Sequence, residues 1–196
     1  MFSDEEKELI CEYSLESIEK LKISLAAHAA YEKIHMSIIK DFSVKLEDTL
    51  KTKITGNWRI NNEIKENRNG RWSGLYIQKD DWGDYQIGIQ PQGLKYTNFY
   101  IGVAKEKGTP DVEGLYEKLQ KIFKDGEKFE SWNWWQWLKN DYRNWTNDQT
   151  LLTLYKNNKG IESEAIRYFS ERIFKIQDAA TELIDAQVRN INGQTG

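Results

Sequence analysis

The chain has 196 residues, of which 39% are hydrophobic and 13% aromatic, so it is long enough to bury a core without disulfides or metals. Its 28 basic and 31 acidic residues leave a formal net charge of -3, which excludes the strongly basic phosphate-backbone binders and the strongly acidic DNA mimics. The single cysteine, Cys11, excludes an intrachain disulfide and a multi-cysteine zinc site, and it favours a reducing compartment.

The chain carries no sequence signal for export, membrane insertion or metal binding. Its first residues are charged and lack the apolar region of a signal peptide, and no apolar stretch reaches the roughly 20 residues that a membrane helix requires. His28 and His35 are seven residues apart, which is too far for the usual i, i+4 chelate. We therefore expect a cytoplasmic protein with no membrane contact, no metal site and no cofactor.

The N-terminal quarter, residues 1–52, is predicted to be a helical arm. Ser3 and the acidic residues after it are typical of a capped helix start, and no proline interrupts the chain until long after. Apolar residues then recur at helical spacing through Ile34, Ile38 and Phe42. One helix of 50 residues would be about 75 Å long, which exceeds a domain of this size, so we expect a break between Lys22 and Tyr31.

Residues 54–105 show the two-residue period of β-strands. The four predicted strands lie at 54–64, 72–78, 85–89 and 99–103, and their connections are too short for parallel crossovers. We predict a four-stranded antiparallel sheet in which one face is covered by helices. The other face is predicted to be exposed to solvent, and it carries Arg59, Asn61, Gln86 and Gln90.

Residues 110–190 are predicted to be helical, and the polar end at 191–196 is predicted to be frayed. A seam of apolar residues from Ile166 to Leu183 alternates by three and four, as in a coiled coil. Its partner is either the N-terminal helix of the same chain or a second subunit, and we favour the first, hence a monomer, because intramolecular docking avoids the entropy of association. The predicted class is thus a single α+β domain.

Catalytic signatures are missing from the sequence, which contains no glycine-rich phosphate loop, HExxH motif or nucleophile elbow. One pattern is compatible with catalysis. Glu63 and Lys65 flank an isoleucine at the end of a predicted strand, and many nucleases use residues in this pattern to hold the metal ion and the attacking water. Such a site also needs a nearby aspartate, and the nearest upstream candidate, Asp48, lies in a predicted helix. The alternative is that Glu63 and Lys65 belong to a solvated strand end.

The most unusual segment runs from Ser131 to Leu138 and contains four tryptophans in six residues: Trp132, Trp134, Trp135 and Trp137. We interpret it as helical, and a helix of this sequence would be apolar over most of its circumference. Three interpretations remain open. The tryptophans form an aromatic part of the core, they form a protein-binding patch, or they stack on single-stranded nucleic acid with help from Lys139 and Arg143.

Four short motifs carry a resemblance to a known family. They are Gly56-Asn57-Trp58, Gly74-Leu75-Tyr76-Ile77, Ile87-Gly88-Ile89 and Ile101-Gly102-Val103, followed by the tryptophan segment. Residues 30–175 resemble the C-terminal region of bacterial and prophage proteins of the PD-(D/E)XK nuclease superfamily. In such proteins a nuclease core precedes this region and holds the catalytic residues, so no residue here inherits a catalytic role. The resemblance implies a setting of phage–host conflict.

These observations favour a non-enzymatic binding protein of a bacterium or phage, an inhibitor or accessory in defence that acts on another protein. A Mg²⁺-dependent nuclease using Glu63 and Lys65 is the first alternative. A nucleic-acid-binding module is the second, and the near-neutral charge weighs against it.

Overall fold

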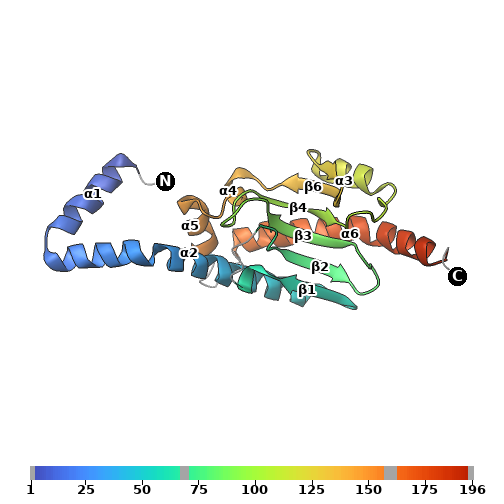
Figure 1. Ribbon diagram of the computed structural model, residues 1–196, viewed down its shortest axis with the longest axis horizontal. Coiled ribbons are helices and arrows are strands. Elements are labelled where there is room, and N and C mark those ends of the chain that lie inside the picture. The colour runs from blue at the N-terminus through green and yellow to red at the C-terminus, as the bar shows by residue number, and fades with distance from the viewer. Residues whose placement is uncertain (1–2, 67–70, 157–162, 194–196) are drawn as a thin grey trace.

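The computed structural model describes residues 3–66, 71–156 and 163–193, and it is an α+β fold with an antiparallel sheet and helices. The sheet has six strands, in the order β1-β2-β3-β4-β6-β5, and every neighbouring pair is antiparallel (Figure 1). The prediction of four strands was wrong in number. The four predicted runs correspond to strands β1 to β4, although the first run is too long, because Ile54 caps the preceding helix and Ile64 lies in a 3-10 turn. Strands β5 and β6 lie in the segment 110–190 that was predicted to be entirely helical.

Helices flank the strands at both ends of the chain and also separate β4 from β5. The helices are α1 (Asp4–Leu15), α2 (Ile18–Lys53), the 3-10 turn η1 (Ile64–Glu66), α3 (Leu115–Phe123), α4 (Asn140–Arg143), α5 (Asp148–Lys156) and α6 (Glu164–Gly193). The strands are β1 (Trp58–Asn62), β2 (Leu75–Lys79), β3 (Gln86–Pro91), β4 (Phe99–Ala104), β5 (Glu127–Phe129) and β6 (Trp132–Trp137). No helix in the described ranges is long and apolar enough to cross a membrane.

The helical arm breaks earlier than predicted. Helix α1 ends at Leu15 and α2 begins at Ile18, where the Ser17 side chain caps the new helix by accepting from the Lys20 backbone N–H. The expected break between Lys22 and Tyr31 does not occur, and α2 continues for 36 residues. It can do so because its N-terminal half projects beyond the body of the protein, together with α1 (Figure 1). The size of the body therefore does not limit the length of the helix.

Helices α2 and α6 cover one face of the sheet and form the main core with it. Helix α2 contributes Ile39, Phe42, Leu46 and Leu50, α6 contributes Phe169, Ile173, Ile176 and Ile184, and the strands contribute Ile77, Ile87, Ile89, Ile101 and Val103. The seam from Ile166 to Leu183 thus packs within the chain, as favoured from the sequence. At the C-terminal end, α6 extends through 191–193, which were expected to be frayed, and 194–196 lie outside the described residues.

Candidate functional site

The tryptophan segment is a β-strand and not the predicted helix. Strand β6 pairs with β4 on one side and with β5 on the other, so it lies inside the sheet. Its neighbours satisfy the backbone hydrogen-bonding groups, which a helix would have satisfied internally. The change of element decides which tryptophans face the core, because side chains in a strand alternate between two faces instead of following a helical stripe.

An extra residue in β6 sets the direction of the four indole rings. Trp132 pairs with Ala104 and Trp134 pairs with the adjacent Val103, so Asn133 is an inserted residue that shifts the register. Trp134 points into the main core, where it is 0% exposed and lies 5.2 Å from the Phe123 ring. Trp132, Trp135 and Trp137 point to the opposite face. The segment is therefore divided, with one tryptophan in the core and three outside it.

The three outward tryptophans surround Tyr100 of β4. The ring centroid of Tyr100 lies 5.0 Å from that of Trp132, 5.4 Å from that of Trp135 and 5.7 Å from that of Trp137, all in edge-on orientations. Edge-to-face contacts at these distances are the favoured geometry of aromatic pairs. With Ala104, these rings form a second apolar cluster that consists of strand residues alone and is separate from the main core. The face that was predicted to be exposed to solvent is therefore covered by aromatic side chains over β4 and β6.

Two glycines allow the rings to lie close to the sheet. Gly88 of β3 and Gly102 of β4 are paired across the strands. A side chain at Gly88 would collide with the Tyr76 ring, and one at Gly102 would collide with the backbone of Trp134 and Trp135. Two of the motif glycines, Gly88 and Gly102, thus have a packing role on this face.

These side chains form a cleft of about 260 Å³, which we call the aromatic cleft. It is lined by Trp72, Gln92, Tyr100, Phe129, Ser131, Trp132, Trp135 and Trp137, none of which is charged. At its rim, Phe129 is 66% exposed and Trp72 is 51% exposed. Trp72 has a backbone φ of 75°, a left-handed conformation that is costly for a bulky residue.

Sequence reasoning predicted only part of this lining. It named Trp132, Trp135 and Trp137 but missed Tyr100, Trp72 and Phe129. For Tyr100 a signal was present, because it alternates with Phe99 and Ile101, whose side chains were assigned to the covered face. Trp72 and Phe129 reach the cleft from outside strands β4 and β6, and no local pattern in the sequence connects them to it.

The two predicted cations differ in their relation to the cleft. Arg143 of α4 places its guanidinium carbon 4.2 Å from the centroid of the Trp137 ring, which is a cation–π contact. Its Nε is buried without a hydrogen-bond partner in the described residues. Lys139 is exposed and is not part of the cleft lining, and its backbone N–H donates to the Tyr168 hydroxyl. Of these two cations, Arg143 therefore contacts a ring of the aromatic cleft and Lys139 does not.

A series of hydrogen-bonded side chains on the same face of the sheet ends at Tyr100 of the cleft. Gln90 donates its side-chain N–H to the Tyr100 hydroxyl, and its carbonyl oxygen accepts from the Tyr76 hydroxyl, which also lies 2.7 Å from the Trp72 carbonyl oxygen. Burial raises the pKa of Tyr100 to about 12, although the bond from Gln90 partly opposes the shift. Burial and the charge of Glu63 also raise the pKa of Tyr76. Both tyrosines are therefore neutral hydrogen-bonding groups at physiological pH.

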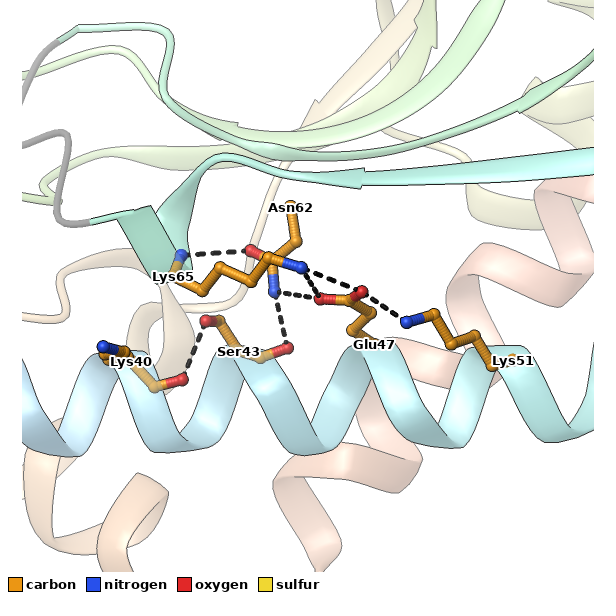
Figure 2. Close-up of polar contacts among 6 residues, drawn as sticks. All are labelled: Lys40, Ser43, Glu47, Lys51, Asn62 and Lys65. Atoms are coloured by element: carbon orange, nitrogen blue, oxygen red, sulfur yellow. Dashed lines mark hydrogen bonds and ion pairs between the residues drawn. The ribbon is translucent and has the colours of Figure 1, made fainter.

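The proposed catalytic residues lie in different surroundings. Lys65 turns toward α2, where its Nζ is 2.9 Å and 3.1 Å from the two carboxylate oxygens of Glu47 (Figure 2). Glu63 instead accepts from the Asn61 side chain at 3.4 Å. The two side chains do not converge, and within the described ranges no group of three or more His, Cys, Asp or Glu side chains could hold a metal ion. The geometry gives no support to the nuclease alternative.

Glu47 is the centre of a buried polar cluster that joins α2 to β1 and η1 (Figure 2). Its side chain is 5% exposed and accepts from Lys51, Lys65 and the Asn62 amide, which also donates to the Ser43 carbonyl. Burial alone would raise the pKa of Glu47, but the hydrogen bonds from Lys51, Lys65 and Asn62 outweigh it and lower the pKa. We interpret this cluster as a structural ion-pair network.

The comparisons with known proteins do not assign the chain to a family. No family model, curated protein or solved structure matches the chain. The resemblance to the PD-(D/E)XK superfamily thus stays a prediction, and the function has to be argued from the site. The aromatic cleft can bind flat or apolar groups by stacking and burial, and Arg143 at its edge can pair with an anionic group.

Proposed function

We propose that this chain is a binding protein that captures a segment of another protein in the aromatic cleft, without chemistry of its own. The observation that carries the proposal is the cluster of Tyr100, Trp132, Trp135 and Trp137 on the face of the sheet that α2 and α6 leave open. Tryptophan, tyrosine and arginine are the residues that dominate binding energy at protein interfaces. Tyr100 and Trp132 are each 5% exposed and Trp135 and Trp137 are half-buried, so the exposed aromatic side chains of the cleft are Phe129 and Trp72 at its rim.

The chemistry of the cleft favours an extended peptide segment with proline or aromatic residues and one acidic residue. Aromatic grooves bind such segments because the segment loses little conformational entropy on docking. The acidic residue would pair with Arg143. A nucleic-acid strand is a poorer fit, because its backbone requires several cations. None of the lining residues is charged, and Arg59 on the same face already pairs with Asp80 at 2.7 Å.

The biological role that we propose is inferred from the resemblance to the nuclease superfamily. A binding protein from a bacterium or prophage would act in the cytoplasm as an inhibitor or accessory in phage–host conflict, by occupying a surface of its target. The missing catalytic motifs in the sequence and the separation of Glu63 from Lys65 are consistent with this role.

A displayed library of random peptides tests the cleft. We expect enrichment of proline- or aromatic-containing peptides with an acidic residue, and we expect Trp135→Ala to weaken the selected peptides at least about tenfold, as for an interface hot spot. Arg143→Gln should weaken them less. Tyr155→Ala, an exposed aromatic residue on α5 outside the cleft, is the matched control and should have no effect.

Two outcomes would contradict the proposal. One is a set of selected peptides that bind Trp135→Ala and Trp137→Ala as well as they bind the wild type. The other is tight binding of a labelled single-stranded oligonucleotide whose affinity falls steeply as the salt concentration rises and is lost in Trp135→Ala.

A further inference from the structure

The projecting arm carries most of the exposed large hydrophobic side chains among the residues that the structure describes. It comprises α1 and the N-terminal half of α2, residues 4–34, and it extends away from the sheet (Figure 1). Of the seventeen large hydrophobic side chains that are exposed in the described residues, ten lie between Leu9 and Ile34. An amphipathic helix is normally stabilised by packing of its apolar face, so this concentration indicates a surface that another chain covers.

One stripe on α2 has an unusual symmetry, and we call it the arm stripe. It consists of Ile23, Ala27, Ala30 and Ile34, with Ile23 at 63% and Ile34 at 52% exposure. The steps of four, three and four place these residues on one face of the helix. Both the spacing and the residue types are the same when the stripe is read in reverse. A stripe of this kind is complementary to a second copy of itself in the antiparallel direction.

We propose that the arm stripe is the contact of a twofold homodimer in which two α2 helices cross in antiparallel orientation. A twofold axis makes every contact occur twice, so Ile23 of each copy meets Ile34 of the other, and Ala27 meets Ala30. The small alanines at the centre allow a close approach of the helices, and the isoleucines fill the ends. This dimer does not use the seam on α6, which is buried within the chain.

Charges and surface shape support the same register. Glu19 and Lys40 flank the stripe on one side of the helix, and antiparallel pairing brings Glu19 of each copy near Lys40 of the other. Beyond Ile34, the stripe runs into a groove of about 460 Å³ between α2 and α5, lined by apolar residues that include Ile38 and Leu152. Asp41 and Asp148 lie in the same groove. The first turns of the second copy's α2, with Lys20 and Ile23, would occupy it.

The contact is long enough to be stable. From Glu19 to Lys40 the helix spans about 32 Å at 1.5 Å per residue. Three heptads of isolated coiled coil are marginal, but the α2–α5 groove adds apolar area outside the two-helix seam. The aromatic cleft lies on the sheet and has no residue in common with this surface, so the dimer does not depend on the proposed peptide binding.

Light scattering at about 50 μM tests the dimer, with an expected mass of twice 23.1 kDa for the wild type. Ile23→Lys and Ile34→Lys should each give a folded monomer with an unchanged circular dichroism spectrum, since both residues are exposed and lie outside the core. Ile122→Lys on α3 is the matched exposed control and should remain dimeric. A wild-type mass of 23.1 kDa would overturn the proposal.

Cysteine cross-linking tests the register. In a Cys11→Ser background, combined Ala27→Cys and Ala30→Cys should give a disulfide-linked dimer, because these positions face each other across the axis. Ala27→Cys alone should stay largely uncross-linked. Efficient cross-linking of Ala27→Cys alone would show a parallel pair and overturn the antiparallel assignment. Glu19→Lys and Lys40→Glu should each raise the dissociation constant several-fold, and the double variant should restore it.

Discussion

Trp134→Ala is expected to lower the free energy of unfolding by about 3–5 kcal/mol, the usual cost of removing a large aromatic side chain from a core. Trp134 is completely buried, packs on Phe123, and lies so close to Gly126 that no side chain fits there. The resulting cavity cannot close, because the strand holding it pairs on both sides. The corresponding fall in Tm is roughly 10 °C for a chain of this length.

The matched control is Trp135→Ala, one residue away on the opposite face of β6. Its indole is only half-buried and faces the aromatic cleft, so its removal should change the free energy of unfolding by less than about 1.5 kcal/mol. Urea unfolding followed by circular dichroism measures both variants. Equal destabilisation of the two would show that both rings belong to one core, and it would remove the basis for the binding cleft.

Glu47→Ala is expected to destabilise the protein by about 2 kcal/mol, which is in the range for buried hydrogen bonds to a charged group. The change removes one of the two acceptors of the buried Asn62 side-chain NH2 group, which keeps the Ser43 carbonyl, and it removes the ion pair that joins α2 to η1. Lys65 is partly exposed, so water can replace its partner, and the loss is smaller than for a fully buried pair.

The same cluster predicts a pH dependence of stability. Because the pKa of Glu47 is lowered from its usual value of about 4.5, the carboxylate stabilises the folded state fully above that value. The stabilisation is lost as the pH falls through the lowered pKa. Urea unfolding at about pH 7 and about pH 3 should therefore show a larger acid-induced loss for the wild type than for Glu47→Gln, which cannot titrate. An identical loss in both proteins would contradict a lowered pKa.

Sequence reasoning predicted the strands whose side chains alternate and missed the strand whose side chains do not. In β3, Ile87 and Ile89 alternate with smaller or polar residues, which produces the two-residue period. In β6, aromatic rings occupy both faces, because Trp134 fills the core and Trp135 fills the aromatic cleft. A strand that is apolar on both faces has no such period, and its apolar run was assigned to a helix. Strand β5 has only three residues, all exposed.

The candidate site was predicted by residue type and not by arrangement. The four tryptophans and Arg143 could be named because such residues are concentrated in one segment, but their division between core and surface depends on the extra residue Asn133. Lys65 was linked to Glu63 by proximity in sequence, whereas its partner Glu47 lies on a helix 18 residues earlier. Contacts between distant segments are set by packing, which local patterns do not contain.

The extra residue at Asn133 also determines how β6 tolerates changes of length. The alternation of side chains between the two faces shifts by one position at Asn133, so the residues before it and after it alternate in opposite phase. If β6 kept Asn133 but paired in regular alternation, Trp132 would turn toward the core face, and Tyr100 would lose one of its three ring neighbours. Deleting Asn133 would instead remove the bulge and leave Trp132 opposite Ala104 on the cleft face. The aromatic cleft should therefore tolerate the loss of Asn133 but not a shift of the β4–β6 pairing by one residue.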